Sequence, residues 1–78
     1  MISKEKFAED LNEMLGTNEK ISMETDLMDI ESWDSFSMVA FIAMAEEKYS
    51  VVIEPFSVAE AVLVEDLYDA VNDAVRRK

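Results

Sequence analysis

The amino-acid sequence predicts an all-α fold, a small four-helix bundle with three long helices and one short helix. The first observation behind this prediction is that apolar residues recur with a helical period over most of the chain. The second is that no stretch has the pattern of a strand ladder, because the β-branched run from Ser50 to Ile53 has no second run to pair with. The third is length: 78 residues are expected to form a single domain, residues 1–78, around a small core.

The first helix is expected to follow Ser3, which can cap it, and to end at Gly16, which suits the position past a helix C-terminus. Its apolar side has helical spacing: Phe7, Leu11, Met14 and Leu15. A long loop then runs from Thr17 to Trp33. Parts of this loop are expected to dock on the core, because it carries four large apolar residues: Ile21, Leu27, Met28 and Ile30. Long ordered loops are often functional.

The second helix is expected over Ser35 to Tyr49 and has two apolar faces. One has ordinary core spacing: Met38, Phe41, Ile42, Ala45 and Tyr49. The other is left over and ends in two acids: Phe36, Val39, Ala40, Ala43, Glu46 and Glu47. A domain of this size cannot easily bury both sides of a helix, so we interpret the second face as a docking surface. The alternative is that it packs beneath the long loop, since helices that are apolar all round are usually buried.

The end of the chain predicts a short helix and a last long one. Pro55 breaks the chain after the second helix, and a short helical turn is expected from about Ser57 to Ala61. The last helix is expected from about Leu63 to Arg76. Its apolar stripe consists of Val64, Leu67, Val71 and Val75. Acidic residues in its first turn and basic residues at its end suit the helix dipole.

Composition excludes several function classes. The chain has 18 acidic and 7 basic side chains, for a net charge of −11. Such a surface repels nucleic acid and anionic lipid and attracts basic protein surfaces, so we expect neither a nucleic-acid partner nor stable membrane insertion. There is no cysteine and no histidine, which removes thiolate sites, the commonest general base and most zinc sites. The polar N-terminus lacks a signal peptide, so the expected location is cytoplasmic.

Ser35 is the candidate functional residue, within Asp34-Ser35-Phe36 at the junction of the long loop and the second helix. A nucleophilic serine needs a general base, and the nearby carboxylates of Asp34 and Glu31 are poor bases unless desolvated. No catalytic residue is therefore assigned. We interpret Ser35 as a substrate for another enzyme, because a phosphodiester on its oxygen would lie at a helix N-terminus. The alternative is that Asp34 or Ser35 serves only as a helix cap.

Asp34-Ser35-Phe36 resembles the Asp-Ser-Leu attachment motif of acyl carrier proteins, with Phe in place of Leu. The resemblance continues through residues 25–27, 45–49, 53 and 65–71 and so covers nearly the whole chain. It implies an acyl-carrier-like bundle with 4′-phosphopantetheine bound covalently to Ser35, beside Asp34. A phosphopantetheinyl transferase would supply this arm from coenzyme A. The thiol of the arm would then carry acyl groups as thioesters, so that the protein itself is not an enzyme.

The resemblance also implies partners, namely acyl-loading and acyl-processing enzymes with basic docking patches. The positions that would contact them are Trp33, Phe36, Val39, Ala43, Glu46 and Glu47. Trp33 has two further readings: it shields the arm, or it pins the loop to the core. The family often shelters the acyl chain between helices, and the candidate lining is Met38, Phe41, Ile42, Ala45, Ile53, Ala59 and Ala61. The alternative for this lining is an ordinary core. A monomer is expected.

Departures from the family pattern favour a dedicated carrier in a lipid, polyketide or surface-polymer pathway. They are Trp33, Ser32 in place of glycine, Ser37 and Ala40 at positions that are often acidic, and Val62 and Leu63 where a capping threonine is common. Two alternatives remain open: an aminoacyl carrier of the D-alanyl type, and an unmodified acidic helical adaptor. A calcium site is not predicted, because the acids between Asp26 and Asp34 lack EF-hand spacing and its central glycine.

Overall fold

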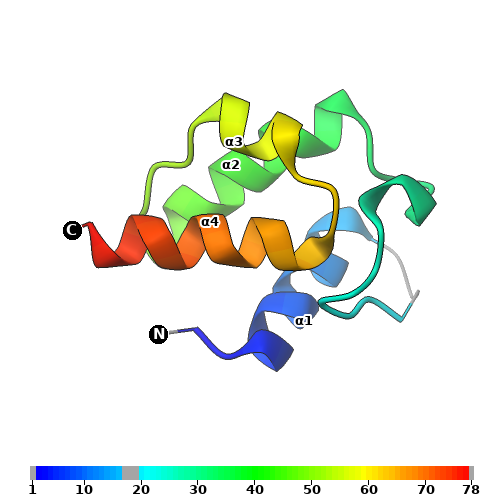
Figure 1. The fold of residues 1–78 in the computed structure, drawn as a ribbon, viewed down its shortest axis with the longest axis horizontal. Coiled ribbons are helices and arrows are strands. Elements are labelled where there is room, and N and C mark those ends of the chain that lie inside the picture. Colours follow the sequence, from blue (N-terminus) through cyan, green and yellow to red (C-terminus); the bar gives the residue numbers. More distant parts are fainter. Residues whose placement is uncertain (1, 17–19, 78) are drawn as a thin grey trace.

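The computed structural model describes residues 2–16 and 20–77, and their regular structure is helical (Figure 1). The elements are α1 (Lys4–Leu15), the 3-10 turn η1 (Leu27–Asp29), α2 (Ser35–Tyr49), α3 (Pro55–Glu60) and α4 (Val64–Arg76). The predicted all-α class, with three long helices and one short one, is confirmed. α2 contacts each of the other three helices and so occupies the centre of the bundle.

Both ends of α1 form as the sequence predicts. The hydroxyl of Ser3 accepts a hydrogen bond from the backbone N–H of Lys6 at 3.1 Å and caps the helix. Gly16 adopts the left-handed conformation with φ 67°. Its N–H donates to the carbonyl oxygens of Asn12 and Glu13 at 3.0 and 3.2 Å, which satisfies two groups that the end of a helix leaves unpaired.

α2 has the predicted bounds, but it ends without a glycine. Ser50 takes the left-handed conformation instead, with φ 57° and ψ 39°. Its N–H donates to the carbonyl oxygen of Glu46 at 3.1 Å. A side chain with a Cβ is strained in this region, so Ser50 closes the helix at a cost that glycine would avoid.

α3 and α4 differ from the expectation by one or two residues. α3 begins at Pro55, because proline suits the first helical position, where its missing N–H has no helical partner to lose. The residue at the N-cap of α4 is Leu63, whose side chain cannot accept a capping hydrogen bond. The carboxylate of Asp66 reaches back instead and accepts from the N–H groups of Val62 and Leu63 at 2.9 and 3.0 Å. Asp66 thereby pairs the amides of the two residues that precede α4.

The described part of the long loop, residues 20–34, lies against the connection between α3 and α4. The N–H of Leu27 donates to the carbonyl of Val62 at 2.8 Å, and the N–H of Val64 donates to the carbonyl of Thr25 at 3.0 Å. Parts of the loop dock on the core as expected, since Leu27 and Ile30 are buried, whereas Met28 is 86% exposed. A 3-10 turn places residues three apart on one side, so Leu27 and Ile30 face the core while Met28 points away. Residues 17–19 lie outside the described part.

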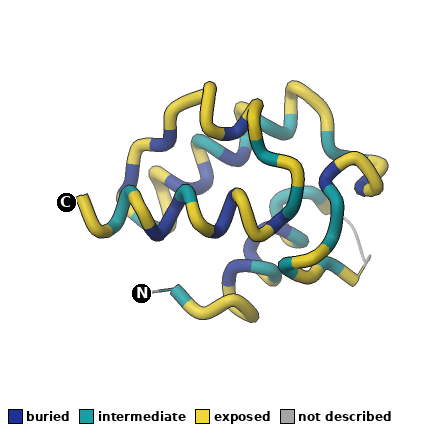
Figure 2. The backbone as a smooth tube through the Cα atoms, viewed as in Figure 1, coloured by how far each residue is buried: buried dark blue, intermediate teal, exposed yellow. Residues whose placement is uncertain are grey.

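The core is built around Phe7 of α1. Its ring centroid lies 6.0 Å from that of Phe41, 6.3 Å from that of Tyr49 and 5.4 Å from that of Tyr68. Figure 2 shows that buried residues recur along α2 and α4, whereas α3 is exposed on most of its length. Aromatic pairs in edge-to-face geometry stabilise a core beyond the area that they bury.

A buried carboxylate joins α1 to the end of α2. Asp10 is 2% exposed and accepts a hydrogen bond from the Tyr49 hydroxyl at 2.6 Å. The ammonium groups of Lys6 and Lys48 lie 2.9 and 3.5 Å from its other oxygen. Burial by itself would raise the pKa of Asp10, but the hydrogen bonds from Tyr49 and Lys6 and the charge of Lys48 lower the pKa below its ordinary value. No pattern in the sequence predicted this cluster.

Candidate functional site

Ser35 is the first residue of α2, and its side chain is exposed. The helix is capped by the preceding residue: Oδ1 of Asp34 accepts from the N–H of Ser37 at 2.9 Å. The hydrogen bond from the backbone N–H of Ser37 lowers the pKa of the Asp34 carboxyl. Asp34 therefore performs the capping that was one alternative for this pair, and the hydroxyl of Ser35 is not needed for it.

Ser37 ties the end of the loop to the first turn of α2. Its hydroxyl oxygen lies 2.6 Å from the carbonyl oxygen of Ser32 and 3.0 Å from Oδ1 of Asp34. A serine hydroxyl has a single proton, and we assign it to the shorter of these contacts, the bond to Ser32. The bond joins Ser37 to Ser32 and so closes a ring, residues 32–37, to which Ser35 belongs. From the sequence, Ser37 stood out only as a departure from a position that is often acidic, and no sequence pattern indicated this role.

Trp33 is half-buried and packs its ring edge-on against Phe41, with the centroids 6.5 Å apart. The backbone N–H of Trp33 donates to the carbonyl oxygen of Ile30 at 3.0 Å, and Ile30 is 2% exposed. Trp33 thus pins the end of the loop to the core, as one of its readings proposed. Contact with a partner stays a prediction for the exposed part of its ring.

The chemistry around Ser35 does not suit catalysis by this residue. The chain has no histidine, and within the described residues the hydroxyl of Ser35 makes no hydrogen bond to a base. The carboxylate of Asp34 is occupied by the cap, and its lowered pKa makes it a weaker base than a free aspartate. What the site offers is an exposed hydroxyl at the positive end of a helix dipole.

The second apolar face of α2 is open to solvent. Phe36 is 83% exposed and Val39 is 66% exposed, so the alternative that this face packs beneath the loop is wrong for both. Ala43 is also exposed, and Glu46 and Glu47 extend the face with two exposed acids. The helix therefore presents an apolar surface beside Ser35 and an acidic one at its other end.

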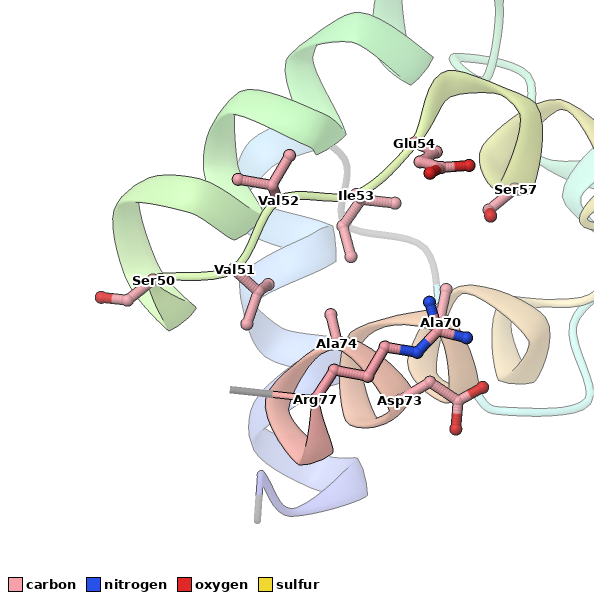
Figure 3. Close-up of a pocket in the computed structure, with 10 residues that line it drawn as sticks. All are labelled: Ser50, Val51, Val52, Ile53, Glu54, Ser57, Ala70, Asp73, Ala74 and Arg77. Carbon is pink, nitrogen blue, oxygen red and sulfur yellow. The ribbon is translucent and has the colours of Figure 1, made fainter.

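The predicted lining of an acyl shelter belongs largely to the core. Three of its members are buried and three are half-buried, while Ala59 is exposed: Phe41, Ala45 and Ile53, then Met38, Ile42 and Ala61. A groove of about 350 Å³ lies between residues 50–54 and α4 (Figure 3). It shares only Ile53 with the predicted lining, and it lies at the C-terminal end of α2 while Ser35 lies at the N-terminal end.

In residues 2–16 and 20–77, no group of three or more acidic side chains is arranged to hold a metal ion. No helix in the same ranges is both long enough and apolar enough to cross a membrane.

The arrangement of the helices matches a known fold. No protein-family model matches the chain, and no curated protein matches it in sequence. The solution NMR structure of a holo acyl carrier protein from Geobacter metallireducens superposes with a TM-score of 0.82 over 99% of this chain and 90% of that one, at 23% sequence identity. This chain has the acyl carrier protein fold. The fold that the sequence resemblance implied is thereby confirmed.

Within this acyl carrier fold, the candidate residues fall into two groups. The candidate motif Asp34-Ser35-Phe36, with the cap at Asp34 and the hydrogen bond from Ser37 to Ser32, lies at the start of α2. The exposed face extends from there along α2 to Glu46 and Glu47. The structure thus brings Ser35 and Phe36 together at one end of the face and keeps the two acids about three helical turns away.

Proposed function

We propose that this chain is a discrete acyl carrier protein that accepts 4′-phosphopantetheine on Ser35. The observation that carries the proposal is the exposed hydroxyl of Ser35 at the start of α2, in a chain with the acyl carrier fold. Because Asp34 already caps the helix, Ser35 is available for modification without loss of the cap.

The modification forms a phosphodiester. A phosphopantetheinyl transferase would join the Ser35 oxygen to the phosphorus of the arm as the bond between that phosphorus and the nucleotide half of coenzyme A breaks. The hydroxyl proton leaves to a base of the transferase, since this chain has no histidine to take it. The positive end of the α2 dipole favours the new anion. The carboxylate of Asp34 lies at the same end of the helix.

The arm would supply the chemistry that the chain lacks. With no cysteine, the reactive sulfur is the thiol of phosphopantetheine, which carries an acyl group as a thioester. The protein would present this cargo to successive enzymes and catalyse nothing itself. Within this proposal it acts as a monomer in the cytoplasm.

The exposed face of α2 is the proposed contact with these enzymes. Phe36, Val39 and Ala43 would pack on an apolar part of the partner, and Glu46 and Glu47 would meet its basic patch. Trp33 would contribute at the edge of this surface. Because the first three turns of α2 carry no charge, we propose a dedicated carrier with few partners, in a lipid, polyketide or surface-polymer pathway.

Intact mass after loading tests the proposal. The full chain is incubated with coenzyme A and a phosphopantetheinyl transferase of broad specificity, beside the variants Ser35→Ala and Ser57→Ala. We expect the wild type and Ser57→Ala to gain the mass of one arm and Ser35→Ala to gain nothing. Ser35 is exposed and is not the cap, so Ser35→Ala should retain the helical circular dichroism of the wild type.

No gain in the wild type would leave the open apolar face as the site of an unmodified adaptor. A gain that survives Ser35→Ala would place the arm elsewhere. Incubation of the loaded protein with aminoacyl-loading enzymes then separates an acyl carrier from an aminoacyl carrier by the mass of the cargo.

A further inference from the structure

A second surface feature adjoins the exposed face of α2. A groove of about 300 Å³ lies between α1 and α2. Its apolar lining comes from both helices: Met14, Ala40, Ala43 and Met44. Glu13 of α1 and Glu47 of α2 also line it, and both side chains are exposed.

The groove is negatively charged. Among the described residues, no cation lies within 4.0 Å of the carboxylate of Glu13 or Glu47. The other two charged residues of the lining are Asp10 and Lys48, whose charged atoms lie 3.5 Å apart, and the ammonium group of Lys6 lies 2.9 Å from the same oxygen of Asp10. The lining therefore carries three acids and one base, and Lys6 interacts with the carboxylate of Glu13 only through its charge, without an ion pair within 4.0 Å.

We propose that this groove receives an arginine side chain of a partner protein. The methylene stem of arginine would lie on Met14, Ala43 and Met44, and its guanidinium group would lie at Glu13 and Glu47. Long cationic side chains combine an apolar stem with a charged head in this way. The planar guanidinium presents several donors to carboxylates, which favours it over an ammonium group.

Other occupants fit the groove less well. An anionic group would meet the two carboxylates and the net charge of −11. A purely apolar side chain would remove water from Glu13 and Glu47 without replacing its hydrogen bonds, which is costly for a charged group. Charge complementarity therefore selects a cation with an apolar stem.

The groove extends the proposed docking surface onto α1. Ala43 and Glu47 belong to both, whereas Glu13 and Met14 belong to a helix that the sequence analysis did not assign to any partner. The inference rests on the proposed function only for the kind of partner, an enzyme that handles the carrier. Binding of a guanidinium group does not require the arm on Ser35.

An NMR titration tests the groove directly. The probe is Nα-acetyl-arginine methylamide, added to the full chain with labelled amides and labelled methionine methyl groups. We expect shifts concentrated at the methyl groups of Met14 and Met44 and at the amides of Glu13 and Glu47. The citrulline analogue has nearly the same shape but no charge, and its affinity should be lower by about fivefold or more.

Matched variants separate the groove from the general acidity of the chain. Glu13→Gln combined with Glu47→Gln should weaken binding of the arginine probe about fivefold, because both charges are lost. Glu24→Gln combined with Glu60→Gln makes the same charge change at exposed positions outside the groove and should leave binding nearly unchanged. All four residues are exposed, so neither variant should unfold.

Three results would overturn the inference: equal affinity for the citrulline analogue, shifts spread over acidic residues throughout the chain, or equal weakening by the control variant. The loading experiment gives an independent answer. If the protein binds the probe in the groove but never gains an arm, the carrier function is contradicted and the arginine site stands. If it gains the arm but shows no specific shifts, the arginine site is contradicted and the carrier function stands.

Discussion

The hydroxyl of Ser37 donates a hydrogen bond of 2.6 Å to the carbonyl oxygen of Ser32, from the first turn of α2 back into the loop. Asp34 and Ser35 lie inside the ring of backbone that this bond closes. The ring adds to the contact of Trp33 with Phe41, and together they hold the end of the loop against the core. The position of Ser35 is therefore fixed from both sides, by the helix and by the loop.

Replacement of Ser37 by alanine should loosen this ring. We expect Ser37→Ala to lower the free energy of unfolding by about 1 kcal/mol, the usual contribution of one intramolecular hydrogen bond. Loading of Ser35 should also slow, mainly through KM, because the serine is held less firmly. Urea unfolding and transferase kinetics measure the two effects.

Ser37→Thr retains a hydroxyl at the same position and should restore both quantities most of the way. Ser57→Ala removes an exposed hydroxyl that makes no hydrogen bond to any described residue, and it serves as the control. Ser37→Ala kinetics and stability equal to those of the wild type would show that the ring does not position Ser35.

The bond between Tyr49 and Asp10 should stabilise the fold in a pH-dependent way. Tyr49→Phe keeps the aromatic ring against Phe7 but leaves the buried carboxylate without its closest donor. We expect a loss of about 2 kcal/mol at pH 7, typical of a hydrogen bond to a charged group. Burial and the bond to Asp10 raise the pKa of the Tyr49 hydroxyl, so this donor stays protonated at neutral pH.

The pH dependence follows from the direction of the Asp10 shift. Its pKa is lower in the folded state than the unfolded value of about 3.9, so the stabilisation is present above that value. It is lost as pH falls through the folded pKa. Urea unfolding of wild type and Tyr49→Phe should therefore converge at acidic pH. A difference that stays constant from pH 7 down to pH 3 would contradict the charged bond.

Glycine at position 50 should stabilise the protein. Ser50 has φ 57°, which glycine adopts without strain. We expect Ser50→Gly to raise the free energy of unfolding by up to about 1 kcal/mol, less than the full strain because glycine also gains freedom in the unfolded chain. Ser50→Ala keeps the Cβ and should give no such gain. Equal thermal midpoints for Ser50→Gly and Ser50→Ala would argue against strain at this residue.

The exposed ring of Phe36 should matter for partners and not for folding. Phe36→Ala removes a side chain that is 83% exposed, so the free energy of unfolding should change by no more than about 0.5 kcal/mol. The kcat/KM of loading should fall, because the ring lies beside Ser35 on the proposed docking face. Val52→Ala is the matched control, since Val52 is 77% exposed but follows the far end of α2. Equal loading by both variants would remove Phe36 from the docking face.

Local patterns in the sequence were enough to predict most of the fold. A capping aspartate and an unbroken apolar run determine the bounds of α2, and Ser3 and Gly16 determine the ends of α1. The loop was harder, because a 3-10 turn has a different period from a helix and placed Met28 outside. The left-handed position at the end of α2 is occupied by Ser50 and not by glycine, so the sequence did not indicate this conformation.

The site was predicted only where its parts are neighbours in sequence. Asp34, Ser35 and Phe36 are consecutive, and the exposed face follows from helical spacing. The bond between Asp10 and Tyr49 joins residues 39 positions apart, and no periodicity reports such a contact. The groove between α1 and α2 likewise depends on how two helices pack, which spacing along one helix does not specify.

The most direct test of phosphopantetheine attachment at Ser35 is the mass of the protein isolated from its own cell, followed by fragmentation to locate any added group. We expect a phosphopantetheine arm on the fragment that contains Ser35, with or without an acyl group on its thiol. An unmodified Ser35 in every molecule, or an arm attached to a different residue, would contradict it.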